Sequence, residues 1–173
     1  MADAEYFDIV DDKNRVIGRA TRKECHGNPS LMHRVVHVIV LNSSGEIFLQ
    51  KRSDNKDIQP GKWDTSVGGH VDSGEHYIDA AYREAQEELG IELGEIPLLY
   101  EYIQTNEIET EWVRTFGSVH DGPFRLNPGE ISDGRFWRFD EIDGSDGNIF
   151  TPNFLDEYKR FKQWQKENRH ILS

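Results

Sequence analysis

The sequence contains very little cysteine, since Cys25 is the single thiol among 173 residues. One cysteine excludes an internal disulfide framework and fits a protein of the reducing cytoplasm. Long apolar runs are missing too, because no stretch approaches the roughly 18 residues of a membrane-spanning helix. The opening MADAEYFDIV is acidic, unlike a secretion signal. We therefore expect a soluble, cytoplasmic protein with no membrane partner.

Basic residues are also scarce. The 20 lysines and arginines are outnumbered by 32 acidic residues, which gives a formal net charge of −12. Such a chain repels a nucleic-acid backbone and an anionic membrane surface, so neither is expected as its main partner. A small phosphorylated ligand stays open, because a bound metal ion reverses the local field.

The predicted elements indicate a single α/β domain over residues 1–173. A hydrophobic share of 36% is low, but with 11% aromatic residues it still favours a globular fold. The run RVVHVIVL, from Arg34 to Leu41, has the pattern of a buried central strand. Thr21 to Leu31 has turn residues and no sustained period, so a loop is expected there. The other predicted strands are Tyr6 to Val10, Val16 to Ala20, Glu46 to Lys51, Trp63 to Val71, Leu98 to Thr105, Trp112 to His120 and Gly134 to Phe139.

Two helices are predicted, and the first two strands form an N-terminal β-hairpin. Ser73 is expected to cap the first helix and Gly90 to end it. Its apolar stripe is Tyr77 or Ile78, Ala81, Ala85 and Leu89. Thr151-Pro152 begins the second helix, whose apolar face is Phe154, Leu155, Tyr158, Phe161 and Trp164 or Gln165. Strands are predicted before and after the two helices, without regular βαβ alternation, and this order predicts a mixed sheet covered by helices.

The first helix carries an acidic cluster. Glu84, Glu87 and Glu88 are related by three- and four-residue steps, so their side chains project from one helical face. Like charges at this spacing repel by a few tenths of a kcal/mol per pair unless a cation neutralises them. Hard divalent ions prefer such carboxylate oxygens. The residues alone predict a metal site, although a solvated acidic face has the same composition.

The segment from Gly69 to Ile91 resembles the signature of the Nudix hydrolases. Gly69 is followed at the required spacings by Glu75, Arg83-Glu84, Glu87-Glu88 and Gly90. The resemblance extends from about Arg34 through Asp140. It implies an α/β/α sandwich and hydrolysis of a diphosphate linkage by attack of metal-bound water, with Mg²⁺ or Mn²⁺ as cofactor.

The same resemblance assigns roles to these residues. Glu84, Glu87 and Glu88 match the metal ligands, and either Glu87 or Glu88 matches the base. Glu75 and Arg83 match the pair that ties the loop to the helix, by a charge-assisted contact. The glycines at 68 and 69 allow close approach of the backbone and the substrate.

Within this superfamily, residues 33–70 resemble the isopentenyl diphosphate isomerase branch. Isomerases of that type hold a metal ion on three histidines and two glutamates. The corresponding residues of this chain are His26, His33, His70, Glu109 and Glu111. The resemblance therefore implies a second cation site, whereas without it each histidine reads as a structural or surface residue.

Three departures argue against isomerase chemistry. Gly68 stands where the isomerase has its catalytic cysteine, and Asn153 stands where it has a pocket tryptophan. The isomerase signature lacks some of the metal glutamates, whereas all of them are present here. The sequence therefore indicates a hydrolase on an isomerase-like scaffold.

Other candidates depend on residue type alone. Glu130 occupies a place where many Nudix enzymes have a further ligand or base, and Arg52, Lys51 and Lys62 are candidates for contact with substrate phosphates. Each reads equally as solvated surface charge. Trp63, Tyr102 and Trp112 are suited to stacking on a base or to the core. The alternatives left open are an isomerase, a non-catalytic nucleotide-binding module, and a homodimer in place of a monomer.

Overall fold

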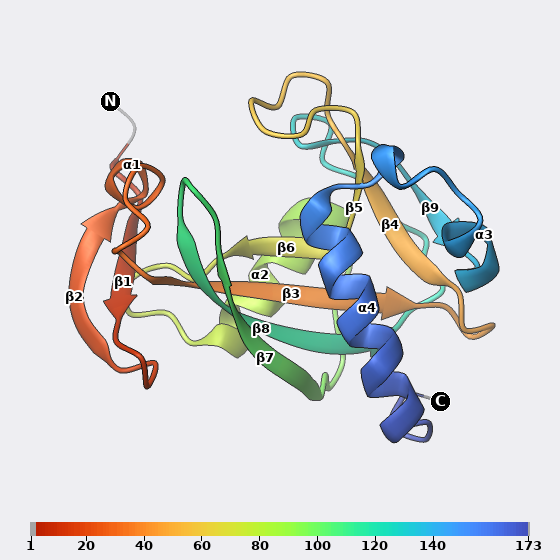
Figure 1. Cartoon of the computed structure of the whole chain (residues 1–173). Coiled ribbons are helices and arrows are strands. Elements are labelled where there is room, and N and C mark those ends of the chain that lie inside the picture. The colour runs from red at the N-terminus through yellow and green to blue at the C-terminus, as the bar shows by residue number, and fades with distance from the viewer. Residues whose placement is uncertain (1–2, 173) are drawn as a thin grey trace.

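The structure is a computed structural model and describes residues 3–172. Nine strands form one sheet, and helices cover both of its faces (Figure 1). The strands are β1 (Tyr6–Val10), β2 (Val16–Thr21), β3 (His33–Leu41), β4 (Ile47–Arg52), β5 (Trp63–Asp64), β6 (Val67–His70), β7 (Leu98–Thr105), β8 (Thr110–Val119) and β9 (Ile131–Trp137). The helices are α1 (Arg22–Cys25), α2 (Tyr77–Leu89), α3 (Phe139–Asp143), the 3₁₀ helix η1 (Gly147–Ile149) and α4 (Pro152–Glu167).

Strand β3 is the centre of the sheet. It pairs antiparallel with β1, β4 and β6 and parallel with β8, so the sheet is mixed as predicted. Within residues 3–172, β3 and β4 share one register pair, Leu41 with Ile47. The sheet therefore divides beyond this pair, with β6, β7 and β8 on the β3 side and β5 and β9 on the β4 side.

The side chains of β3 alternate between two cores. Val36, Val38 and Val40 pack with the apolar stripe of α2, while Ile39 and Leu41 pack with α4. Burial on both faces explains the almost continuous apolar run of this strand. Fully burying one such aliphatic side chain contributes about 1.5–3 kcal/mol, so the β3 register strongly determines where α2 and α4 lie.

Most predicted elements are confirmed, including the N-terminal hairpin and both long helices. The predicted N-cap is wrong: α2 begins at Tyr77 after His76, and the Ser73 hydroxyl instead donates to Asp8 Oδ1 at 2.7 Å. The predicted loop after Thr21 contains α1, which a capping box between Thr21 and Glu24 stabilises. Trp63 to Val71 is two strands, and the last predicted strand already ends at Trp137.

No helix within residues 3–172 has the length and apolar character needed to cross a membrane.

Candidate functional site

The loop that enters α2 is fixed by one arginine. Arg83 donates two parallel hydrogen bonds to Glu75, from Nε to Oε1 and from Nη2 to Oε2, each 2.9 Å long. Nη2 also donates to the carbonyl of His70 at 3.0 Å. Burial raises the pKa of Glu75, but the Arg83 hydrogen bonds outweigh it and the net shift is downward. The paired charges of Arg83 and Glu75 therefore lock the loop to the helix.

Glu84 is held under the backbone of β6. Its side chain is 14% exposed and accepts a hydrogen bond from Arg83 Nη1 at 2.8 Å. A methyl group on Gly69 would overlap the Glu84 carboxyl group, so only glycine permits this approach. Burial raises the pKa of Glu84 to about 7, although Arg83 opposes the shift.

Glu88 is the second half-buried carboxylate of the helix. Its Oε2 accepts from Gln50 Nε2 at 3.0 Å and from the Gly68 amide at 3.2 Å. Burial, followed by repulsion from Glu84, raises the pKa of Glu88 well above its ordinary value. Gln50 comes from β4, so Glu88 connects the two halves of the divided sheet. No sequence signal pointed to Gln50.

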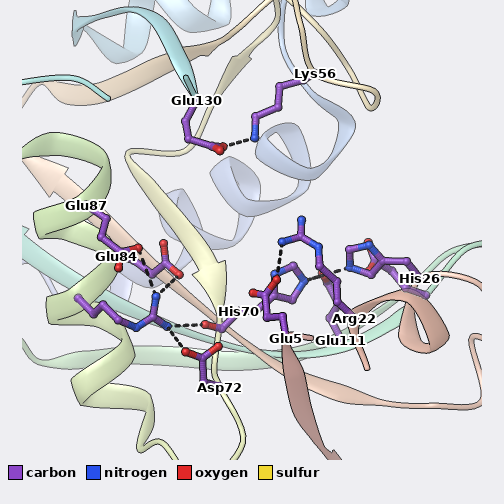
Figure 2. Close-up of polar contacts among 12 residues, drawn as sticks. Glu5, Arg22, His26, Lys56, His70, Asp72, Glu84, Glu87, Glu111 and Glu130 are labelled. Atoms are coloured by element: carbon purple, nitrogen blue, oxygen red, sulfur yellow. Dashed lines mark hydrogen bonds and ion pairs between the residues drawn. The ribbon is translucent and has the colours of Figure 1, made fainter. Parts of the chain in front are cut away.

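Glu87 differs from its two neighbours because its side chain is 56% exposed. It lies 3.4 Å from Arg83 Nη1 (Figure 2). The three glutamates thus differ in their exposure to solvent: Glu87 is exposed, whereas Glu84 and Glu88 are half-buried. Two half-buried carboxylates with raised pKa values and hard oxygen donors fit a divalent cation such as Mg²⁺ or Mn²⁺.

The predicted phosphate contacts Arg52 and Lys62, and the predicted further ligand or base Glu130, lie apart from the three glutamates of α2. Arg52 donates from Nε to the carbonyl of Ile58 at 3.0 Å and lies 3.5 Å from Asp64. Lys62 is half-buried in the loop before β5. Glu130 forms an ion pair with Lys56, which joins two loops away from Glu84 and Glu87 in Figure 2. The fold thus provides each of these charges, except Lys62, with a partner inside the protein.

The five isomerase-like residues converge on the sheet face opposite α2. Candidate ligand atoms of four of them, His26, His33, His70 and Glu109, all lie within 4.8 Å of one another. Glu111 Oε1 lies 3.9 Å from Nε2 of both His33 and His70. Figure 2 shows His26, His70 and Glu111 together. Segments far apart in the sequence supply these groups, so the cluster exists only in the folded chain.

Two buried polar atoms of this cluster have no hydrogen-bond partner within residues 3–172, namely His33 Nε2 and Glu109 Oε2. His33 Nδ1 lies 3.2 Å from the carbonyl of Leu31, an arrangement that directs the Nε2 lone pair towards the cluster. Burial lowers the pKa of both His33 and His70, so both imidazoles are neutral near pH 7. His70 Nε2 lies 3.3 Å from His26 Nε2. Neutral imidazoles whose ring nitrogens converge beside a carboxylate fit a transition-metal ion.

A buried carboxylate on α4 was missed by sequence analysis. Glu157 lies on the apolar face of α4, yet its side chain is only 1% exposed and accepts from His37 Nδ1 at 2.7 Å. The pattern contained a signal for it. Position 157 is three residues from Phe154 and four from Phe161, which places a glutamate inside the predicted apolar stripe.

A mixed sheet lies between α2 and α4, and Gly69 of β6 leaves space for Glu84 of the acidic helix α2. Together these features define a Nudix-type fold. A sequence model of the NUDIX domain matches residues 31–158, and the chain belongs to this family. An uncharacterized Nudix hydrolase of Yersinia pestis is 37% identical, over 95% of this chain and 87% of the relative. The protein is therefore a hydrolase acting on phosphorus-containing anhydrides.

Solved structures agree with this fold. DR0079 from Deinococcus radiodurans superposes with a TM-score of 0.77 at 26% identity, covering 90% of this chain and 98% of that one. The NUDIX domain of Shewanella oneidensis NrtR, solved with ADP ribose, gives a TM-score of 0.60 over 75% of this chain and 86% of that one. At 13% identity the second likeness shows the fold alone.

Proposed function

We propose that the protein cleaves the diphosphate linkage of a nucleoside di- or triphosphate or a related diphosphate compound, with Mg²⁺ or Mn²⁺ bound by Glu84, Glu87 and Glu88. The observation that carries the proposal is the half-buried pair Glu84 and Glu88. Their pKa values are raised by burial, so in the absence of a cation their ionised forms are costly. A bound cation removes this cost, because its charge stabilises the ionised forms of both carboxyl groups.

A divalent cation bound there would neutralise phosphoryl oxygens and lower the pKa of a coordinated water. The chain itself has to hold the acidic helix in place and accept a proton from the attacking water. Glu88 suits the base role better than Glu87, because two hydrogen bonds orient its carboxylate whereas Glu87 is largely exposed. Its Oε2 is occupied by these bonds, which leaves Oε1 to take the proton.

The substrate side is formed by the β6 backbone and the loops around it. The missing side chain of Gly69 makes room for Glu84, and we place the diphosphate at the strand edge beside Gly68. Arg52 and Lys62 lie on the β4 side, where they serve the remote part of the substrate. We also assign the protein to the cytoplasm, where the buried and unpaired thiol of Cys25 would stay reduced.

A substrate panel tests this proposal. Purified protein is incubated with Mg²⁺ and nucleoside di- and triphosphates, ADP-ribose and isopentenyl diphosphate, and the products are identified by ³¹P NMR and mass spectrometry. We expect release of phosphate or pyrophosphate and a loss of roughly 100-fold or more in kcat for Glu88→Gln. Glu92→Gln, at an exposed residue after α2, is the matched control.

The outcomes separate the alternatives. Dimethylallyl diphosphate as the product would identify an isomerase, and nucleotide binding without turnover would identify a binding module. Full activity in folded Glu88→Gln would remove the proposed mechanism.

We further assign a second cation site to His26, His33, His70, Glu109 and Glu111. The support for it is that two buried atoms of this converging group, His33 Nε2 and Glu109 Oε2, have no hydrogen-bond partner within residues 3–172. They lie 3.7 Å apart, and Glu109 Oε2 lies 3.2 Å from His26 Nε2. Leaving such atoms unsatisfied costs about 1–3 kcal/mol each, and a bound ion removes that cost. Imidazole nitrogens favour a transition metal over Mg²⁺.

Metal analysis tests this second site. After dialysis against Zn²⁺ or Mn²⁺ and desalting, we expect elemental analysis to find one bound transition-metal ion per chain. His26→Gln, at a half-buried ligand, is expected to lose that ion, and His76→Gln, at an exposed histidine, to retain it. Equal metal content in both variants would refute the site.

A further inference from the structure

A histidine and a glutamate form a buried pair on the sheet face covered by α4 (Figure 1). His37 lies on β3 and Glu157 lies on α4, 120 positions later in the chain. His37 Nδ1 and Glu157 Oε2 are 2.7 Å apart, and the two side chains are 12% and 1% exposed. The pair lies outside both metal clusters described above and has no part in the proposed mechanism.

Glu157 accepts four hydrogen bonds, which identifies it as a carboxylate. Tyr102 and His37 donate to Oε2, and Tyr100 and Thr115 donate to Oε1 at 2.5 and 2.9 Å. Burial opposes ionisation, but these donors outweigh it and lower the pKa of Glu157. Burial likewise opposes charge on His37, yet the adjacent Glu157 raises the pKa of His37. Both shifts favour the charged forms of the pair, an imidazolium beside a carboxylate.

The far side of the His37 ring faces the strand that borders the acidic helix. His37 is in register with Gly68 on β6, and a Cβ on Gly68 would lie 3.3 Å from His37 Cδ2 and 3.6 Å from Nε2. The Gly68 amide itself donates to Glu88 Oε2 at 3.2 Å. One residue without a side chain therefore separates the His37 ring from the Glu88 carboxylate of the acidic helix.

One edge of this strand has no neighbouring strand within residues 3–172. Among residues 3–172, β6 pairs with β3 alone. In the same part of the chain, His37 Nε2 has no hydrogen-bond partner, while Nδ1 is held by Glu157. With Nδ1 held by Glu157, a protonated His37 presents Nε2–H as an oriented donor that has no partner in the described part of the chain.

Two arginines near this edge are already paired. Arg83 donates to Glu75, Glu84 and the carbonyl of His70. Arg52 donates to the carbonyl of Ile58 and lies beside Asp64. A cationic donor of the protein strengthens the binding of a diphosphate at an edge rich in carboxylates. Lys62 lies on the β4 side, before β5, whereas His37 lies directly beside Gly68.

We propose that His37 is a substrate-binding residue whose Nε2–H donates to a phosphoryl oxygen of the bound diphosphate, and that Glu157 is the positioning residue that orients the ring. The assignment rests on the proposed hydrolase function. In it, the substrate diphosphate lies along the edge of β6, with Glu84 and Glu88 on one side of Gly68 and His37 on the other.

Kinetics and NMR test the two roles separately. For His37→Gln we expect KM to rise roughly 10-fold or more, with a smaller change in kcat, because a charge-assisted hydrogen bond to the ground-state diphosphate is lost. Glu157→Gln is expected to raise KM in the same direction. His76→Gln, at an exposed histidine without a side-chain cap bond, is the control.

The NMR probe is inorganic pyrophosphate with Mg²⁺, added to wild-type protein labelled with ¹⁵N-histidine. We expect the His37 Nε2 resonance to shift on titration while Nδ1 keeps the signature of a strong hydrogen bond. An unmoved His37 Nε2 resonance, or a folded His37→Gln with wild-type KM, would overturn the proposal. Failure of the wild type to cleave any panel substrate would instead overturn the hydrolase function, and the pyrophosphate titration still decides the role of His37.

Discussion

The buried position of Glu84 predicts that the metal-free protein loses stability as the pH rises. The ordinary pKa of a glutamate is 4.5, and burial raises that of Glu84 to about 7 in the folded state. A carboxyl group whose pKa is higher in the folded than in the unfolded protein stabilises the fold fully only at pH values below its unfolded-state pKa. For Glu84, this stabilisation is lost as the pH rises through about 7. The difference corresponds to about 3 kcal/mol between acidic solution and pH 8.

Glu84→Gln is the perturbation that isolates this contribution. Glutamine is neutral at every pH, and its carbonyl oxygen can still accept the hydrogen bond from Arg83. We therefore expect the free energy of unfolding of the variant in EDTA to fall about 2–3 kcal/mol less than that of the wild type between pH 5 and pH 8. Glu92→Gln, at an exposed position, is expected to follow the wild type.

The assay is urea unfolding followed by tryptophan fluorescence, at four pH values and with and without Mg²⁺. If Mg²⁺ binds the folded form at the proposed site, it is expected to restore the stability of the wild type at pH 8 and to have less effect on Glu84→Gln. If the wild type and Glu84→Gln lose stability in parallel as the pH rises, then Glu84 is not desolvated. The argument that ionising Glu84 and Glu88 is costly without a bound cation then fails.

Two further predictions concern the surroundings of the site. Gly69→Ala places a methyl group in the space of the Glu84 carboxyl group, so kcat is expected to fall by roughly 10-fold or more, since small displacements of reacting groups are costly. Gly18→Ala, which meets no atom within 4 Å, is the control, and equal kcat values would contradict the steric argument. Glu157→Ala leaves an imidazolium and two tyrosine hydroxyls without their acceptor, and is expected to lower the free energy of unfolding by about 3–5 kcal/mol in urea titrations. Asp156→Ala on the same helix removes a surface ion pair and is expected to cost under about 1 kcal/mol, so similar losses in both variants would show that Glu157 is not a buried anion.

Most of the fold was predictable because it follows from local periodicity. The continuous apolar run of β3 marks a strand buried on both faces, and the stripes of α2 and α4 repeat with the helical period. Element boundaries were less accurate. Ser73 has the residue type of an N-cap, but a tertiary contact with Asp8 uses its hydroxyl, so α2 begins four residues later at Tyr77.

The acidic helix was readable from spacing alone, since residues three and four apart share a face whatever surrounds the helix. The burial of Glu84 and Glu88 was not. It depends on β6 lying against α2 and on Gln50 reaching Glu88 from β4, across the division of the sheet. The raised pKa values, and with them the argument for a bound cation, come from that packing.

Residue types and spacings by themselves thus determined the family, the mixed α/β architecture and the glutamates of the acidic helix. Tertiary structure alone decided which of those glutamates are buried, brought His26, His33, His70 and Glu109 within 4.8 Å of one another, and paired His37 with Glu157. The physical reason is range. Helical and strand periods act over a few residues, whereas these pairings join segments up to 120 positions apart, which meet only when the hydrophobic cores on the two faces of the sheet form.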